Sequence, residues 1–167
     1  FNFGDLPMHG QHNLSNAVMA MYAAFLHGID PQKSFSALKS SKGVKRRFEA
    51  IFKSNDKVVI DDFAHHPTAI SHTIQAAINH FSSKKILGII ELASNTMSQG
   101  HHGADLYDSA SSLEKVYWLN LSSKKNQEFE YDSINSLLAD IKKEIDNFDV
   151  ILIMSNKDSK KISEPVI

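Results

Sequence analysis

The chain has 167 residues, which is enough for one domain with a sizeable core, and its formal charge at pH 7 is −1. A charge so close to zero gives no sign of a basic surface for nucleic acid, so we expect no nucleic-acid partner. No apolar run approaches the roughly 20 residues of a membrane span, so we expect no membrane partner either. There is no cysteine, which excludes disulfides, cysteine-ligated zinc and thiol nucleophiles and suits a cytoplasmic protein.

The first part of the chain predicts a short helical hairpin. Residues 14–28 place apolar side chains at helical spacing and end in Gly28, a residue type that favours the end of a helix. Asp30 and Pro31 then supply the cap and the first position of a second helix. The chain opens on Phe1 without a methionine, so we expect it to be part of a longer protein.

A domain boundary is predicted in the basic connector at residues 41–47, between residues 1–43 and residues 44–167. Beyond it, apolar runs typical of strands alternate with segments of helical spacing. The expected strands are 46–52, 57–63, 84–92, 115–121 and 149–155. The expected helices are 66–81, 103–113 and 132–146, and the polar segment 122–132 is expected to be a loop. This alternation predicts an α/β, Rossmann-like fold, a mostly parallel sheet with helices on both faces, preceded by the helical hairpin.

Three polar segments follow predicted strands, at residues 61–66, 94–96 and 155–156. In an open parallel sheet, ligands bind outside the carboxyl ends of the strands. Because the carboxyl ends of parallel strands lie along the same edge of a sheet, we expect these three segments to form one site.

The first of these segments carries Asp61, Asp62, His65 and His66 between a buried strand and a helix. A shared metal is one interpretation, but adjacent side chains in an extended chain point to opposite faces, so we predict no metal held by this chain. Two interpretations stay open. One member of each pair caps the next helix or hydrogen-bonds the backbone, or the group binds a polar ligand such as a nucleotide, with a carboxylate accepting from a hydroxyl pair.

Two further patterns each have an ordinary structural explanation when taken alone. Asn13 and Asn16 share one helical face but could simply cap the first helix, and Arg46 and Arg47 suit phosphate or carboxylate but could be surface residues. Taken together, "GQHNLSN", a helical hairpin, "GVKRRFE" and "DDFAHHPTA" resemble the Mur ligase family, the ATP-dependent amide-bond ligases of peptidoglycan assembly. The resemblance covers essentially the whole chain, from the end of the family's central ATPase domain through its C-terminal domain.

The resemblance implies a nucleotide site. Asn13 and Asn16 would lie at the nucleotide, one of them near adenine, Arg47 would reach the ATP phosphates, and Asp62 would accept hydrogen bonds from the ribose hydroxyls. The cofactors implied are ATP and Mg²⁺. The family's phosphate loop and Mg²⁺ ligands lie upstream, in sequence not present here, so we expect this chain alone to be inactive.

The resemblance also implies a reaction, in which the UDP-N-acetylmuramate carboxylate is phosphorylated and a peptide amine attacks the acyl phosphate. Arg47, His65 and His66 would serve this chemistry, the two histidines by shaping the cleft. Within the family, "SNTM" is most similar to the branch that joins the tripeptide L-Ala-γ-D-Glu-meso-diaminopimelate to UDP-N-acetylmuramate in peptidoglycan recycling. Three residues would then face the incoming peptide: Ser94, Asn95 and Thr96. A sibling branch joins L-alanine, instead of the tripeptide, to UDP-N-acetylmuramate.

The chain departs from that branch at two places. Glu91-Leu92-Ala93 stand where Glu-Pro-Arg is typical, so an arginine that would meet the peptide carboxylate is missing. Residues 157–162, "KDSKKI", replace a glycine-rich stretch. Two functions of other classes also stay open, a metal-dependent phosphoesterase built on the Asp/His group and a non-catalytic doubly wound interaction domain.

Overall fold

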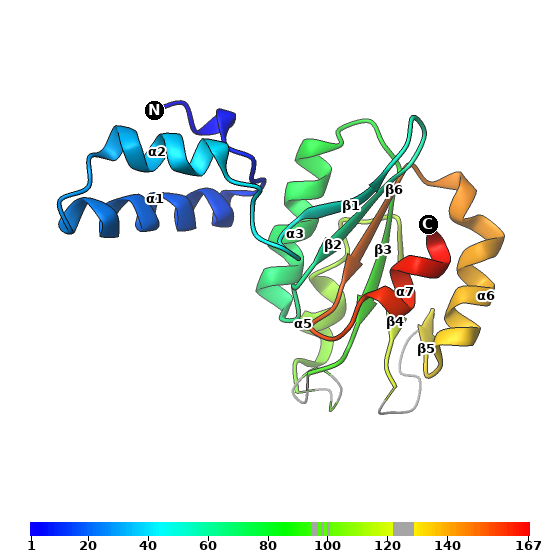
Figure 1. Cartoon of the computed structure of the whole chain (residues 1–167). Helices are drawn as coiled ribbons and strands as arrows, with labels where there is room; N and C mark the ends of the chain where they lie inside the picture. The colour runs from blue at the N-terminus through cyan, green and yellow to red at the C-terminus, as the bar shows by residue number, and fades with distance from the viewer. Residues whose placement is uncertain (95–96, 98, 100, 122–128) are drawn as a thin grey trace.

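The computed structural model describes residues 1–94, 97, 99, 101–121 and 129–167. A helical hairpin, blue to cyan in Figure 1, projects from one side of an α/β domain formed by the rest of the chain. The hairpin consists of α1 (Gln11–Leu26) and α2 (Pro31–Ser40), preceded by the 3-10 helix η1 (Phe3–Asp5). None of the helices among the described residues is long and apolar enough to cross a membrane.

The ends of the hairpin helices follow from single residues. Asp30 accepts hydrogen bonds from the backbone N–H groups of Gln32 and Lys33, which caps α2 as predicted. Helix α1 begins at Gln11, earlier than the predicted residue 14, because Gly10 adopts a φ of 89° and turns the chain into the helix there.

The sheet has six strands in the order β1-β2-β6-β3-β4-β5. The strands are β1 (Glu49–Lys53), β2 (Val58–Asp62), β3 (Ile86–Glu91), β4 (Lys115–Leu119), β5 (Glu130–Tyr131) and β6 (Val150–Met154). Only the hairpin of β1 and β2 is antiparallel among the strand pairs of the described residues, and its register shifts between Ala50 and Phe52. The predicted mostly parallel α/β fold is therefore confirmed.

Strand β5 corrects the prediction of a loop over residues 122–132. Glu130 and Tyr131 pair in parallel with Trp118 and Leu119 of β4, and Tyr131 is buried. The polar composition of this segment favoured a loop. The strand forms nevertheless, because its backbone pairs with β4 and the side chain of Tyr131 is buried. Residues 122–128 lie outside the described part of the chain.

Helices cover both faces of the sheet (Figure 1). One face packs against α3 (Pro67–His80) and α5 (Gly103–Asp108), and the other against α6 (Ile134–Glu144) and α7 (Lys160–Ser163). The predicted helix 103–113 thus ends at Asp108, and α7 was not predicted. Short 3-10 helices η2 (Ile145–Asn147) and η3 (Glu164–Val166) follow α6 and α7.

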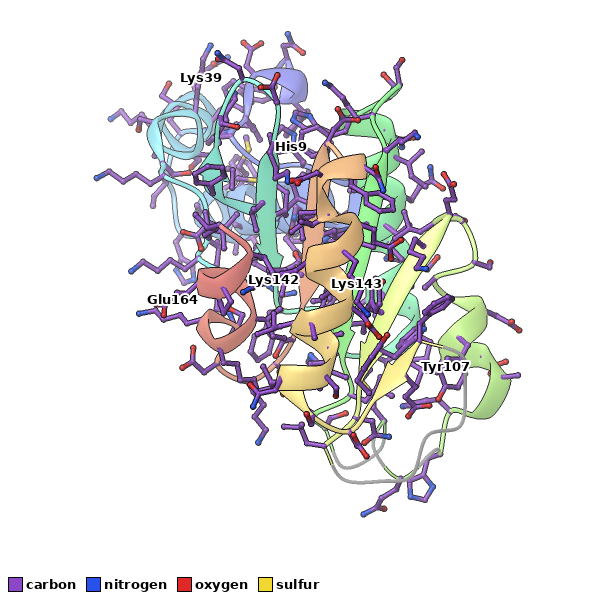
Figure 2. All side chains as sticks on the ribbon, turned by 90° about the vertical axis from the view of Figure 1, so that its right-hand side faces the viewer. His9, Lys39, Tyr107, Lys142, Lys143 and Glu164 are labelled. Atoms are coloured by element: carbon purple, nitrogen blue, oxygen red, sulfur yellow. The ribbon has the colours of Figure 1, made fainter. Side chains whose placement is uncertain are left out.

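Alternation along each strand assigns its side chains to the two cores. Ile60 of β2 joins the core beneath α3 and α5, whereas its neighbour Val59 joins the core beneath α6 and α7. Helix α6 buries Leu137 and Ile141 and exposes lysines such as Lys142, which is labelled on its outer side in Figure 2.

Strand β6 has a protected position, because it lies between β2 and β3 and all five of its residues are buried. It therefore brings the carboxyl ends of β2, β6 and β3 side by side, although β2 and β6 are far apart in the sequence. The three polar segments predicted to share one edge follow these strands.

Replacing an isoleucine of β6 by alanine should cost far more stability than the same replacement in β1, at the edge of the sheet. Ile153 is completely buried, so Ile153→Ala should lower the free energy of unfolding by about 2–5 kcal/mol. Ile51 of β1 is 36% exposed, so Ile51→Ala should cost only about 0.5 kcal/mol. Urea denaturation of the two variants measures both, and equal losses would contradict the central position of β6.

Candidate functional site

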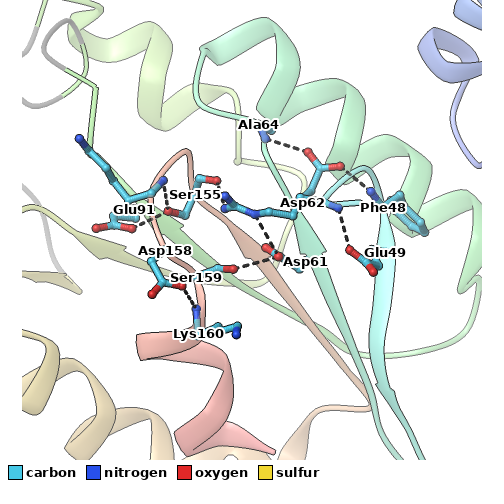
Figure 3. A network of polar contacts seen from close by, with 12 residues as sticks. Phe48, Glu49, Asp61, Asp62, Ala64, Glu91, Ser155, Asp158, Ser159 and Lys160 are labelled. Carbon is cyan, nitrogen blue, oxygen red and sulfur yellow. Dashed lines mark hydrogen bonds and ion pairs between the residues drawn. The ribbon is translucent and has the colours of Figure 1, made fainter. Parts of the chain in front are cut away.

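The two adjacent aspartates at the end of β2 point to opposite faces of the sheet. Figure 3 shows Asp62 directed toward Phe48 and Ala64, and Asp61 directed toward Ser159. This is the alternation expected of an extended chain, and it separates the pair into two different environments. No group of three histidine, aspartate or glutamate residues in the described part of the chain is arranged to hold a metal ion.

Asp62 is bound within the chain. It is 1% exposed, and its carboxylate accepts hydrogen bonds from the backbone N–H groups of Phe48 at 2.7 Å and Ala64 at 2.8 Å, and from Thr73 Oγ1 at 3.2 Å. A carboxylate offers about four acceptor positions, so these three donors leave about one. The ribose contact implied by the family resemblance stays a prediction that depends on this remaining position.

Asp61 belongs to a buried polar network beneath α7. Its Oδ2 accepts hydrogen bonds from Ser159 Oγ at 2.9 Å and from Arg46 Nε at 3.2 Å. Its Oδ1 is buried without a hydrogen-bond partner among the described residues. Burial raises the pKa of Asp61, while the hydrogen bond from Ser159 and the charge of Arg46 oppose that rise.

The network continues to the ends of β6 and β3. Arg46 Nη2 donates to the carbonyl of Ser155 at 2.6 Å, and the hydroxyl of Ser155 donates to Glu91. Glu91, which is 2% exposed, also forms an ion pair with Lys161. Arg46 and Lys161 are therefore engaged with buried acidic residues, and the "KDSKKI" segment supplies one of these two cations.

Arg47 is placed quite differently from Arg46. It is exposed, and no hydrogen bond or ion pair holds its guanidinium within the described residues, although it lies 5.9 Å from the centre of the Phe63 ring. It lines a cavity of about 670 Å³ between the hairpin and β1, together with Asn13 and Asn16. Three of the four residues predicted for the nucleotide thus line one cavity. The fourth, Asp62, does not line it, but it binds the backbone N–H of Phe48, which does.

The wall of this cavity is built by the amino end of α1. Asn13 is 8% exposed, and its side-chain amide donates to the carbonyl of His9 at 2.8 Å, which fixes the segment before the helix. Asn16 is exposed one turn later on the same helix. An amide group both donates and accepts hydrogen bonds, as recognition of a nucleotide base requires, and the adjacent guanidinium suits phosphate. The residues present therefore fit part of a nucleotide site.

A second cavity, of about 270 Å³, opens at the start of α3. Arg47 lines it as well, with His12, His66 and His72. His66 is the N-cap residue of α3 but makes no capping hydrogen bond with its side chain, and its ring lies 4.7 Å from that of His102. His65 instead lies beside its own loop, with Nδ1 2.8 Å from the carbonyl of Phe63. His66 and Arg47 therefore share a cavity, and His65 does not line it.

The predicted peptide loop is only partly described. Ser94 follows β3 at the expected edge, and its hydroxyl accepts from the backbone N–H of Met97 at 3.4 Å. Asn95 and Thr96 lie outside the described residues, so their role stays a prediction. No acidic cluster for Mg²⁺ is present in the described residues, and the magnesium ligands remain expected upstream.

Two histidine pairs between the hairpin segment and α3 were missed by the sequence analysis. The ring centres of His9 and His80 are 4.0 Å apart, and those of His12 and His72 are 5.9 Å apart. Burial lowers the pKa of His9, and the neighbouring His80 lowers it further. The spacing of eight residues between His72 and His80 could have indicated one helical face, but only the fold shows what that face meets.

Comparison with known proteins shows the family of this chain. Residues 46–157 match the protein family described as "Mur ligase, glutamate ligase domain". The chain belongs to the Mur ligase family. The predicted resemblance is thereby confirmed over more than half of the chain.

Individual Mur ligases extend the similarity to other parts of the chain. The UDP-N-acetylmuramate–L-alanine ligase of Ligilactobacillus salivarius (strain UCC118) is 36% identical over 120 residues, which are 71% of this chain and 26% of that protein. A ligase of the same name from Streptococcus pyogenes serotype M28 (strain MGAS6180) is 46% identical over 87 residues, 52% of this chain and 19% of that protein. The chain therefore spans only about a quarter or less of the length of these curated relatives.

A solved structure matches nearly the whole chain. The crystal structure of a murein peptide ligase from Psychrobacter arcticus 273-4 superposes with a TM-score of 0.71 at 31% sequence identity, covering 96% of this chain and 37% of that one. This match includes the helical hairpin as well as the sheet domain. The two sets of relatives carry names with different substrates, so they share a family but not one acceptor.

The histidine pairs predict a pH effect on stability. Because folding lowers the pKa of His9 below about 6.5, the unfolded chain takes up a proton that the folded chain resists, and stability is lost as pH falls through about 6.5. Unfolding by urea at pH 7.5 and pH 5.5 should therefore show a lower midpoint at pH 5.5. His9→Gln should reduce that difference, whereas His27→Gln, at the exposed end of α1, should not. Identical pH differences in all three proteins would contradict this assignment.

Proposed function

We propose that this chain is the C-terminal part of a murein peptide ligase, a cytoplasmic enzyme that uses ATP to join L-Ala-γ-D-Glu-meso-diaminopimelate to UDP-N-acetylmuramate. The observation that carries the proposal is the cavity in which Asn13, Asn16 and Arg47 meet. Asn13 and Asn16 lie on α1 of the hairpin, Arg47 lies in the connector that follows the hairpin, and the family resemblance implies that all three contact ATP. The 31% sequence identity with the Psychrobacter arcticus murein peptide ligase supports the choice of branch.

The hairpin then belongs to the central domain of the full enzyme, with the boundary at residues 43 and 44. Large apolar side chains on α1 support this division, because Met19, Tyr22, Phe25 and Leu26 are each more than half exposed. Such a helix face is normally covered by protein in the assembled molecule. The upstream part of the central domain would cover it and would bring the phosphate loop and the Mg²⁺ ligands to the nucleotide.

In this proposal the chain itself binds and orients. Asn13 and Asn16 lie at the nucleotide, one of them near adenine, Asp62 accepts from the ribose through its remaining acceptor position, and Arg47 contacts the phosphates. Transfer of a phosphoryl group develops charge on its oxygens, and a guanidinium stabilises that charge. His66, which shares a cavity with Arg47, shapes the phosphate end of the cleft, and His65 supports the same loop.

The peptide is assigned to the loop after β3, with Ser94, Asn95 and Thr96 as its polar contacts. Lys161 is a cation at the same strand end, where it forms an ion pair with Glu91. The runner-up is a UDP-N-acetylmuramate–L-alanine ligase, which the names of the curated relatives favour. A metal-dependent phosphoesterase finds no support in the described residues, where no metal-binding group is arranged.

The nucleotide assignment is tested by removing the exposed arginine from the full-length enzyme. Arg47→Ala should lower kcat/KM for ATP by roughly tenfold to a hundredfold, because a hydrogen bond to a charged group contributes about 1.5–3 kcal/mol. Lys45→Ala removes the same charge from an exposed residue two positions away and serves as the matched control. Equal, small effects of both variants would exclude a phosphate contact by Arg47.

The choice of branch is tested by offering both acceptor amines to the full-length enzyme with ATP and UDP-N-acetylmuramate. The tripeptide should be ligated at least roughly tenfold more efficiently than L-alanine, since a site built for several polar groups loses affinity when they are absent. Phosphate release at varied acceptor concentration measures both rates. A preference for L-alanine would assign the chain to the runner-up branch and leave the nucleotide site unaffected.

A further inference from the structure

We propose that residues 61–63 form a clamp that holds residues 46–48 in a strained turn and thereby aims Arg47 into its cavity, with Asp61 and Asp62 as positioning residues. This inference rests on the proposed function for the identity of the nucleotide, but the clamp itself is a feature of the chain. It assigns to both aspartates a role that is independent of any direct contact with a ligand.

The turn needs to be held because its backbone is unfavourable. Arg46 has a φ of 56° and Phe48 a φ of 55°, so two residues with side chains lie in the left-handed region that glycine prefers. Such conformations persist only where the surrounding structure imposes them, and they gather at functional sites. Arg47 is the residue between them.

Each of the three clamp residues contributes a contact to the turn. Asp62 Oδ2 accepts from the Phe48 N–H at 2.7 Å, and the Phe63 N–H donates to the carbonyl of Arg46 at 2.9 Å. Asp61 Oδ2 accepts from Arg46 Nε at 3.2 Å. The two residues that flank Arg47 are thus fixed by their backbone or side chain to the end of β2.

The flanking side chains are also occupied, which leaves Arg47 alone to reach outward. Arg46 extends under the sheet edge to the Ser155 carbonyl, and the Phe48 ring is buried in the core beneath α3. The Phe63 ring lies beneath both guanidinium groups, 5.1 Å from that of Arg46 and 5.9 Å from that of Arg47. An arginine held in this way loses less conformational freedom when a phosphate arrives, so binding and rate both gain from its orientation.

The clamp acts beside the proposed ribose contact of Asp62. A double-mutant cycle in the full-length enzyme with 2′,3′-dideoxy-ATP, which lacks the ribose hydroxyls, isolates the clamp. If Asp62 also acts through Arg47, Asp62→Asn should lower kcat/KM roughly tenfold with dideoxy-ATP. In an Arg47→Ala background the same change should cost less than about twofold with dideoxy-ATP, because the arginine to be positioned is gone. A loss that disappears with dideoxy-ATP would overturn the clamp and leave the ribose contact alone, and a loss with dideoxy-ATP that persists without Arg47 would overturn it as well.

Asp61 gives a second test that no ribose contact can imitate, since its carboxylate lies beneath α7 and away from the cavity. Asp61→Asn keeps the size of the side chain and removes the charge that holds Arg46. It should lower kcat for ATP more than it raises KM, because a loosened Arg47 mainly loses its stabilisation of the charge that develops in the transition state. It too should have little effect after Arg47→Ala. Asp56→Asn, in the exposed turn before β2, is the matched control and should leave the kinetics unchanged. Full activity of Asp61→Asn would overturn the proposed role of Asp61.

The clamp can also be measured in this chain without any nucleotide. In the folded chain the Phe48 amide should be protected from hydrogen exchange by Asp62, and Asp62→Asn should speed its exchange at least roughly tenfold while amides of β6 stay protected. Unchanged Phe48 exchange would overturn the clamp even if the enzyme uses ATP as proposed. Failure of the full-length enzyme to bind ATP, with Phe48 exchange accelerated as expected, would instead reject the proposed function and retain the clamp. If amides throughout the chain lose protection in Asp62→Asn, Asp62 stabilises the whole fold, and the clamp as a local feature is rejected.

Discussion

The hydrogen bond between the Phe48 backbone and the Asp62 carboxylate joins the two parts of the molecule on which the candidate site depends. Phe48 directly follows the connector at residues 41–47. Asp62 is the last residue of β2, the strand with which the parallel part of the sheet begins. Because the acceptor is buried and charged, this bond is among the stronger kinds in a protein, and breaking it would leave a carboxylate in the interior with fewer donors. The positions of Arg47 and of the cavity wall follow from this junction.

Much of the fold could be predicted because the responsible signals are local. A short apolar run such as residues 149–155 favours a buried strand, and Asp30 with Pro31 favours a helix start. Strand β5 could not be predicted, because its two residues are held by pairing with β4 and not by their own composition. The order of the strands is likewise invisible in a single sequence, since β6 enters the sheet between two strands that precede it by many residues.

In the candidate site, too, the features with a local sequence signal could be predicted, and those that depend on long-range contacts could not. The family pattern predicted that Asn13, Asn16 and Arg47 act at one site, and the three line one cavity. Alternation along β2 correctly separated Asp61 from Asp62. What it could not show is which acceptors are already occupied inside the chain. Two of the three donors on Asp62, those of Phe48 and Thr73, and the engagement of Arg46 and Lys161 with buried acids, depend on contacts across more than ten residues of sequence. Long-range pairing of this kind leaves no local pattern.

The two edge strands of the sheet limit how other polypeptides can bind to this chain. A strand at a sheet edge exposes unpaired backbone groups that invite another chain to add a strand. Here β1 carries a register irregularity between Ala50 and Phe52 and ends in Lys53, and β5 at the opposite edge has only two residues. Neither edge offers a long, regular template. Further polypeptide should therefore dock on this chain through side chains of helices and loops, and concentrated solutions should resist association by growth of the sheet.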